Sequence, residues 1–223
     1  KHQIKALQEL ESMMDPALKR DDSPWVQTWR NLPDPDYSTG VITPELMSRL
    51  TRFGPSSFDQ FFCQDLNEAL SMSGFDSDLD ALRMLMANLL HESGEFQYLK
   101  EIDPGHYLEF RTDIGNTEKG DGPKFRGVTP LQVTGRYNYA RAAAWMREWM
   151  GVDDPLIMEQ GCDYIAEIYP FTFMVPWLLD NDLLNICKTE GFNACCYKIN
   201  GGWNGKADRD HYYKICKREI LSL

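Results

Sequence analysis

The sequence is poor in histidine and has no Cys-x-x-Cys pair, and both absences argue against a metal centre. Structural zinc sites use closely spaced Cys and His ligands, and a zinc-protease helix needs a second histidine four residues after the first. The four histidines lie far apart, at positions 2, 91, 106 and 211, and Glu95 stands where that second histidine would be. We therefore expect no metal site.

Positive charge and long apolar runs are also scarce. The formal net charge is −11 and the isoelectric point is near 4.8, whereas nucleic-acid binding needs clustered Lys and Arg. The longest apolar stretch, residues 171–179, is interrupted by Thr172 and Pro176 and is shorter than the ~18 residues of a membrane span. No signal-peptide pattern is visible. We expect neither a nucleic-acid partner nor a membrane span.

The six cysteines give an even count, but they lack the dense spacing of a small disulfide-stapled domain. Cys195 and Cys196 are adjacent and cannot comfortably bridge each other, so any disulfides would join distant segments. The simpler interpretation is that the cysteines are buried free thiols that pack as small apolar residues.

The first 40 or so residues differ in pattern from the rest of the chain. Apolar residues at helical spacing predict a short amphipathic helix over residues 5–14, and Asp-, Ser- and Pro-rich breakers follow. Trp25 and Trp29 are expected to dock this part onto the main body. We interpret residues 1–41 as an N-terminal extension or linker and residues 42–223 as one domain.

From residue 42 onward the pattern is mainly helical. Thr43, Pro44 and Glu45 read as an N-cap, an N1 proline and a first-turn acid, which predicts a helix to about residue 52. Asp78 opens a helix with a buried leucine stripe. Further helices are predicted over Ser57–Met72, Tyr137–Met150, Cys162–Leu179, Phe192–Lys198 and Lys206–Leu221. Residues 103–124 predict a long loop, and residues 131–134 a short strand or a turn. The fold class is therefore all-α, with a small irregular or β-turn region.

Two glutamates are candidate catalytic residues. Glu92 lies in the last turn of the helix that Asp78 opens, within His91-Glu92-Ser93-Gly94, and Glu101 follows nine residues later. Two carboxyl groups on adjoining elements can flank a scissile bond, one donating a proton and the other activating water. Nine residues span at most ~30 Å, so the chain allows the ~6.5–9.5 Å of an inverting pair. The alternatives are a glutamate that hydrates a helix end and an exposed loop glutamate.

The most specific patterns lie between residues 115 and 140 and between residues 199 and 209. The first contains Gly115-Asn116, Gly120-Asp121-Gly122 and the run Phe125-Arg126-Gly127-Val128-Thr129-Pro130-Leu131-Gln132-Val133-Thr134-Gly135-Arg136-Tyr137-Asn138-Tyr139-Ala140. The second contains Ile199-Asn200-Gly201-Gly202-Trp203-Asn204-Gly205 and Ala207-Asp208-Arg209. Together with the His-Glu-Ser-Gly motif, these stretches resemble glycoside hydrolase family 19, that is, the chitinases and, more closely, the phage endolysins. The resemblance covers roughly residues 42–221.

This resemblance implies a lysozyme-like helical fold with a cleft, and it implies roles for particular residues. Glu92 matches the general acid of the family, Glu101 the second catalytic glutamate, and Thr134 the residue that helps to hold the attacking water. Substrate contacts are implied for His91, Gln132, Tyr137, Asn138, Asn200 and Arg209. The reaction requires no cofactor.

One departure from the family pattern stands out. Family members usually read Gly-Arg-Gly where this chain has Gly127-Val128-Thr129. If the missing arginine orients the catalytic carboxylates, activity is weakened. If it only braces the loop, Thr129 and Pro130 substitute for it.

We therefore predict a peptidoglycan-degrading glycoside hydrolase, an endolysin or virion-associated lysozyme that acts on the bacterial cell wall. It would cleave β-1,4 bonds between N-acetylated amino sugars by an inverting acid/base mechanism. Two alternatives stay open. One is a catalytically weak wall-binding or structural module of a larger virion protein, and the other is a chitinase acting on chitin.

Overall fold

The structure, a computed structural model, describes residues 40–223. The helix predicted over residues 5–14 and the docking of Trp25 and Trp29 lie outside the described residues, and the boundary near residue 41 stays a prediction. In chain order the α-helices are α3 (Pro44–Leu50), α4 (Gln60–Met72), α5 (Leu79–Glu92), α6 (Asp121–Lys124), α7 (Arg136–Met150), α8 (Leu156–Gln160), α9 (Cys162–Ile168), α10 (Val175–Asp180), α11 (Leu183–Glu190), α12 (Phe192–Asn200) and α13 (Lys206–Glu219). Short 3₁₀ turns lie at η2 (Pro55–Ser57), η3 (Phe75–Ser77), η4 (His106–Leu108), η5 (Thr112–Ile114) and η6 (Thr172–Met174).

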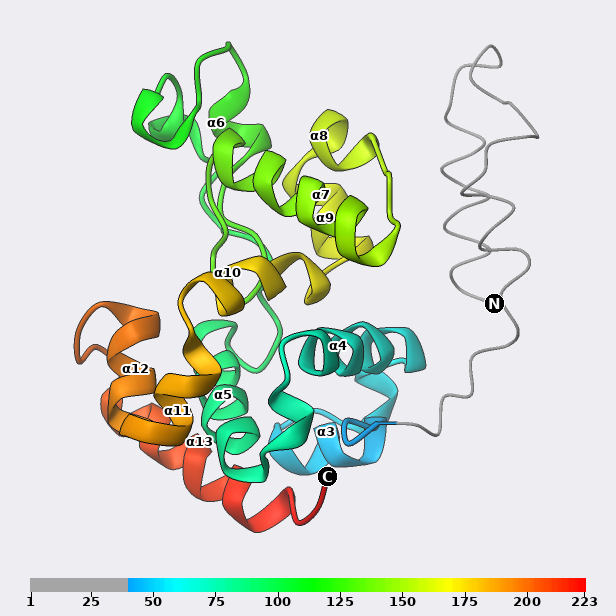
Figure 1. The fold of residues 1–223 in the computed structure, drawn as a ribbon, viewed down its shortest axis with the longest axis vertical. Helices are drawn as coiled ribbons and strands as arrows, with labels where there is room; N and C mark the ends of the chain where they lie inside the picture. Colours follow the sequence, from blue (N-terminus) through cyan, green and yellow to red (C-terminus); the bar gives the residue numbers. More distant parts are fainter. Residues whose placement is uncertain (1–39) are drawn as a thin grey trace. The chain divides into compact units, whose positions relative to one another are not determined.

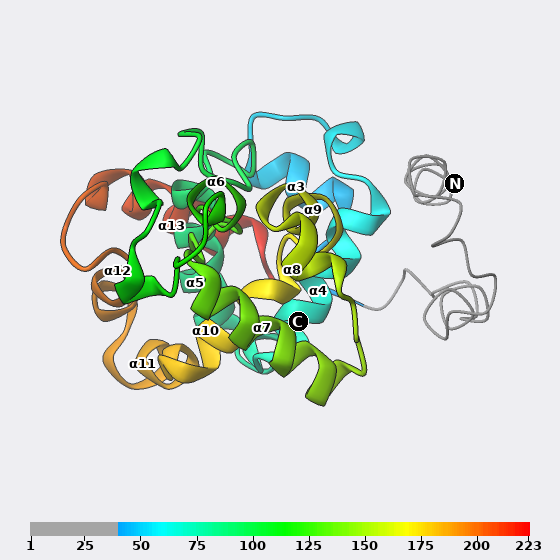
Figure 2. The same ribbon diagram turned by 90° about the horizontal axis from the view of Figure 1, so that it is seen from above.

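The helices fall into two groups with α10 between them (Figure 1). One group holds α3, α4, α5 and the last three helices, and the other holds α6 to α9. Figure 2 views the structure from the side of α6 and α8. Among the described residues, β-structure is limited to two isolated antiparallel bridges, which pair Val128 with Lys100 and with Val133. The all-α class with a small irregular region is thus confirmed.

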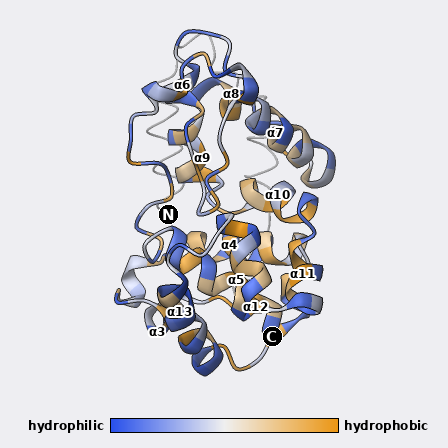
Figure 3. Ribbon diagram, turned by 90° about the vertical axis from the view of Figure 1, so that its left-hand side faces the viewer, coloured by the Kyte–Doolittle hydropathy of each residue, from blue (hydrophilic) through white to orange (hydrophobic). Residues whose placement is uncertain are grey.

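Helix α5 is the central helix of the first group. Its N-cap residue, Asp78, accepts a hydrogen bond from the backbone N–H of Ala81 at 2.9 Å, as the sequence predicts. Most residues of α5 are buried, and the helix packs against α13, α11 and α12. Figure 3 shows apolar residues concentrated along α4 and α5, whereas α13 is mainly hydrophilic. The helix ends at Glu92, so the packing of α5 fixes the position of the first candidate catalytic residue.

Most predicted helices are confirmed, with ends that differ by one to three residues. The exception is the single helix predicted over residues 162–179, which is wrong. The structure has α9 and α10 there, separated by a turn around Pro170 and by η6. Proline lacks a backbone N–H and disfavours a helical conformation in the residue before it, so it kinks or breaks a helix at this position. The sequence does not predict the short helices α6, α8 and α11. The long loop predicted over residues 103–124 is therefore wrong at its end, where α6 lies, and it also holds η4 and η5.

A buried aspartate on α4 holds the turn between α9 and α10. Asp65 accepts hydrogen bonds from the backbone N–H of Phe171 at 2.6 Å and from the Thr172 hydroxyl at 2.7 Å. It also accepts the backbone N–H of Thr172 at 3.3 Å. These bonds satisfy donors that the interrupted helix leaves free, because the first N–H groups of any helix lack internal partners. The turn is therefore anchored to the core by one side chain.

Candidate active site

Glu92 is held by a buried arginine. The Arg209 guanidinium, on the first turn of α13, donates from Nη2 to Glu92 Oε1 and forms an ion pair with it. The Arg209 side chain is 1% exposed, whereas that of Glu92 is 22% exposed. The structure thus brings together two residues that the sequence singled out 117 positions apart. In this arrangement the carboxylate partner of Arg209 is Glu92, and a direct sugar contact of Arg209 stays a prediction.

His91, the residue before Glu92 on α5, also contacts α13. Its Nδ1 lies 2.6 Å from Oδ2 of Asp208, which precedes Arg209 on α13. Gly205 lies directly against the imidazole ring, since a Cβ added to Gly205 would be 2.1 Å from His91 Nε2. This close approach, together with a φ of +68°, requires glycine at position 205. The motifs around His91 and Asp208 therefore contact each other in the structure.

Glu101 lies on an irregular stretch that pairs with the segment around Gly127. Its backbone N–H donates to Gly127 O at 2.7 Å, and its carboxylate Oε2 accepts the Gly127 N–H at 3.1 Å. The other oxygen, Oε1, accepts the Tyr107 hydroxyl at 2.5 Å. This hydrogen bond to Glu101 raises the pKa of Tyr107 to about 12. Glu101 is half-buried and fixed at both carboxylate oxygens, so it is not a freely moving loop glutamate.

The hydrogen bond from Tyr107 to Glu101 can be tested by mutation. We expect Tyr107→Phe to lower kcat by about tenfold, because one of the two donors that orient the carboxylate is lost and a general base depends on its orientation. Steady-state kinetics on a soluble oligosaccharide measures the effect. Tyr213→Phe is the matched control, since Tyr213 stacks on Phe192 and forms no hydrogen bond with Glu101, and this variant should keep full activity. Equal activity of the Tyr107→Phe variant and the unmodified protein would refute a role for this bond.

Gln132 and Glu101 flank the same glycine. A Cβ added to Gly127 would be 2.1 Å from Gln132 Oε1 and 3.4 Å from Glu101 Oε2. Both side chains therefore lie directly against the Cα of Gly127. Thr134 donates its hydroxyl to Gln132 O at 2.7 Å, which fixes the rotamer of the predicted water-holding residue. The structure therefore brings Gln132 beside Glu101 and attaches Thr134 to the Gln132 backbone.

The turn that departs from the family pattern is closed without an arginine. Val128 is fully buried and forms both bridges, and the N–H of Thr129 donates to Leu99 O at 2.8 Å. Thr129 is buried with a φ of +66°, a conformation that a β-branched residue adopts only under strain. Its hydroxyl accepts the backbone N–H of Leu131 at 3.3 Å. Thr129 thus braces the turn at the position where the family usually has glycine.

Tyr137 and Asn138 lie exposed on the first turn of α7. Asn138 Nδ2 donates to Thr134 O at 2.7 Å, which links it to the predicted water-holding residue. Gly115 lies against the Tyr137 backbone, because a Cβ there would be 2.9 Å from Tyr137 N. These contacts place both predicted sugar-binding residues on the segment that follows Thr134.

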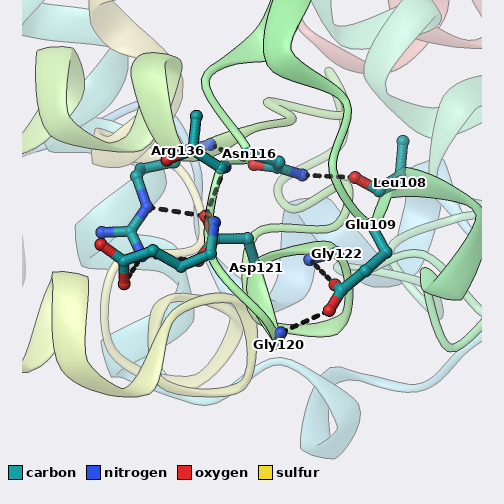
Figure 4. A network of polar contacts seen from close by, with 9 residues as sticks. Leu108, Glu109, Asn116, Gly120, Asp121, Gly122 and Arg136 are labelled. Atoms are coloured by element: carbon teal, nitrogen blue, oxygen red, sulfur yellow. Dashed lines mark hydrogen bonds and ion pairs between the residues drawn. The ribbon is translucent and has the colours of Figure 1, made fainter.

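A polar network holds the start of α7 against the loop that carries η4 and η5 (Figure 4). Asn116 accepts the Arg136 N–H at 2.9 Å and donates to Leu108 O at 2.9 Å. The Arg136 guanidinium pairs with buried Asp121. Burial acts to raise the pKa of the Asp121 carboxyl, but the hydrogen bonds from Arg136 and from the backbone together with the charge of Arg136 outweigh it and lower the pKa. Glu109 accepts the N–H groups of Gly120 and Gly122. The region predicted as a plain loop is thus ordered by paired charges and backbone donors.

Asn200 is the last residue of α12, and its Oδ1 atom is buried without a hydrogen-bond partner among the described residues. Buried acceptors are nearly always satisfied by protein, water or ligand. The structure therefore leaves an acceptor free at this predicted substrate-binding residue. Among the described residues no hydrogen bond joins Asn200 to Glu92 or to Glu101.

Sequence reasoning missed three residues that contact the candidate site, namely Asn88, Tyr107 and Asp208. Asp208 precedes Arg209 in a motif that was singled out, so the sequence held a signal for it. Asn88 lies one helical turn before Glu92, which places both on the same face of α5. Nothing in the spacing of Tyr107 indicates its bond to Glu101.

Within residues 40–223 no group of three or more His, Cys, Asp or Glu side chains could hold a metal ion. No helix of that region is long and apolar enough to cross a membrane.

No family model matches the chain. Its sequence is similar to plant chitinases. It is 29% identical to Endochitinase At2g43610 of Arabidopsis thaliana over 141 residues, which cover 60% of this chain and 46% of that protein. It is 30% identical to Chitinase 4 of Oryza sativa subsp. japonica over 171 residues, which cover 70% of this chain and 56% of that protein. The chain thus spans about half the length of the curated relatives that it matches.

Solved structures share the fold. The class IV family 19 chitinase of Zea mays matches with a TM-score of 0.58 at 18% identity, over 82% of this chain and 94% of that chain. Chitinase C of Streptomyces griseus HUT6037 matches with a TM-score of 0.55 at 17% identity, over 82% and 93%. The resemblance of the sequence motifs to the chitinases is therefore confirmed, and the chain has the lysozyme-like, mainly helical fold of the glycoside hydrolase family 19 chitinases.

Proposed function

We propose that the chain hydrolyses β-1,4 bonds between N-acetylated amino sugars by an inverting acid/base mechanism. The observation that carries this proposal is the pair of glutamates, each fixed by a different set of partners on a different element. Glu92 lies at the end of α5 against the buried Arg209, and Glu101 lies on a bridged segment against Tyr107 and the Gly127 N–H. Two carboxyl groups on different elements, each held by its own partners, can supply the acid and the base of an inverting pair.

In the proposed reaction Glu92 donates its proton to the leaving glycosidic oxygen. Glu101 removes a proton from a water molecule on the opposite face of the sugar, and Thr134 helps to hold that water. The water oxygen forms the new bond to the anomeric carbon as the glycosidic bond breaks, which inverts the configuration at that carbon. The chemistry needs no cofactor.

The substrate class follows from the polar groups near these carboxylates. Amide and hydroxyl groups of Gln132, Asn138 and Asn200 are suited to N-acetyl and hydroxyl groups of a sugar. We place bacterial peptidoglycan first, in lysis of the host cell or in a virion, on the expectation from the sequence motifs that the chain is similar to phage endolysins. Chitin is the second candidate, and the names of the similar plant proteins favour it.

Mass spectrometry of the products tests this function on both polymers. The protein is incubated with purified peptidoglycan and with chitin oligomers, and the anomer formed first is read by NMR. Release of disaccharide products with an inverted anomer supports the proposal, and the polymer that is cleaved faster identifies the substrate. Binding to the wall without any product overturns it and favours the wall-binding module.

Salt dependence provides a separate prediction for the wall substrate. The three arginines that could form a basic patch are each paired, Arg126 with Asp163, Arg136 with Asp121 and Arg209 with Glu92. The net charge of −11 then repels an anionic wall. At an ionic strength of ~0.5 M the screening length is below ~5 Å, so added salt largely removes this repulsion. We expect the rate of wall lysis to hold steady or rise as salt increases. A steep fall, measured by turbidity, would contradict it.

A further inference from the structure

Asn88 contacts the arginine that holds Glu92. It lies on α5 one turn before Glu92, is completely buried, and its Oδ1 accepts the Arg209 Nη1–H at 2.5 Å. Its Nδ2 donates to Met84 O at 2.8 Å. Because Nδ2 is bound to a carbonyl oxygen and Arg209 offers only donors, the amide can face the guanidinium only with its oxygen. The orientation of the Asn88 amide is thus fixed by both partners.

Every edge of the Arg209 guanidinium has a partner. Nη1 donates to Asn88, Nη2 donates to Glu92, and Nε donates to Asn204 O at 3.3 Å. The guanidinium is planar and rigid, so two fixed edges determine the direction of the third. Asn88 and the Asn204 carbonyl therefore set where Nη2 meets the Glu92 carboxyl group.

We propose that Asn88 is a positioning residue for the catalytic acid and that it acts through Arg209. This inference rests on the proposed function of Glu92. Without the acceptor at position 88, Nη1 loses its partner in a buried place, and the guanidinium turns or shifts to find another. Glu92 then no longer presents its proton in the geometry that the reaction needs.

Asn88→Leu tests the proposal, because leucine has a similar volume and no acceptor. We expect kcat to fall on the order of 10²-fold, with KM changed less than about threefold, since Asn88 does not touch the sugar. Asn88→Asp keeps an acceptor at the same reach and should recover at least about tenfold of the lost kcat. Asn67→Leu is the matched control, since Asn67 also bridges two segments by bonding the backbone N–H and C=O of Ile42 and forms no hydrogen bond with Arg209 or Glu92. It should lower the melting temperature and leave kcat unchanged.

A double-mutant cycle with Arg209→Lys shows whether the effect passes through the arginine. Lysine keeps the charge but has no second edge for Asn88, so Asn88→Leu should lower kcat less than about threefold in that background. A loss as large as in the unmodified protein overturns the proposal. If Asn88→Leu does not fold, Asn88→Ser replaces it, because the shorter hydroxyl does not reach Nη1.

An NMR readout separates failure of this inference from failure of the proposed function. The side-chain Nε–H signal of Arg209, assigned by its loss in Arg209→Lys, should exchange slowly with water in the unmodified protein. It should exchange at least about tenfold faster in Asn88→Leu, whether or not any sugar is cleaved. Unchanged exchange overturns the positioning role. Inactivity of the unmodified protein on both polymers, with the NMR result as expected, refutes only the function.

Discussion

Glu92→Gln is expected to lower the rate of hydrolysis at least about 10³-fold while the fold stays intact. Glutamine has the shape of glutamate but no acidic proton, so the leaving oxygen departs without protonation. Its amide oxygen can still accept from Arg209, which keeps a partner for the buried guanidinium and avoids the penalty of an unpaired charge. Product release is measured together with the melting temperature and the circular dichroism spectrum.

Glu95→Gln is the control for this change. Glu95 lies three residues beyond Glu92, accepts the Tyr212 hydroxyl at 2.9 Å and accepts the Arg52 N–H at 2.9 Å. The proposed mechanism gives it no role, so its glutamine variant should retain activity within about threefold. Full turnover by the Glu92→Gln variant would remove Glu92 from the mechanism. Equal losses in both variants would indicate that the charge of this surface, and not one acid, matters.

The second large effect concerns stability and is expected for Asp65→Ala. This change leaves the N–H groups of Phe171 and Thr172 and the Thr172 hydroxyl without an acceptor in the core. Buried donors without partners cost about 1–3 kcal/mol each, and we expect the free energy of unfolding to fall by about 3–5 kcal/mol. Denaturant titration measures the change. A loss below about 1 kcal/mol would show that the turn does not depend on Asp65.

The same residue links stability to pH. Burial raises the pKa of Asp65 to about 7, although the hydrogen bonds from Thr172 and Phe171 act in the opposite direction. The folded state then binds a proton that the unfolded state has released above about pH 4. The contribution of Asp65 to stability is fully present below that pH and is lost as the pH rises to about 7, by about 1.4 kcal/mol per pH unit. Asp65→Asn should remove this slope, and an unchanged slope would assign it to other groups.

Local signals in the sequence were sufficient for the helices with clear caps. Thr43 and Asp78 each accept an N–H of the first turn of their helix, as their positions before an apolar-periodic segment predict. Pro170 carried an equally local signal, yet the apolar residues on both sides favoured one long helix. The turn there depends on Asp65, which lies more than 100 positions away in sequence and could not be paired with it from periodicity alone.

In the candidate site, too, the sequence identified individual residues but not the contacts between distant segments. The motifs predicted that Glu92, Glu101 and Arg209 matter, but not that Arg209 would be buried against Glu92 and Asn88. The setting of Glu101 arises from bridges between Lys100, Val128 and Val133, which join segments by backbone atoms that have no side-chain signature. Tyr107 reaches Glu101 only because the loop folds back, and no spacing rule describes that return.

All six cysteines are buried as free thiols, and this has a practical consequence. Burial raises the pKa of Cys63 and of Cys216 to about 12 and that of Cys162 to about 11, so these sulfurs stay protonated at neutral pH. Since the thiolate is the form that reacts with oxidants, these protonated thiols react slowly as long as the protein stays folded. We therefore expect dithiothreitol and mild peroxide to leave the folded protein equally intact.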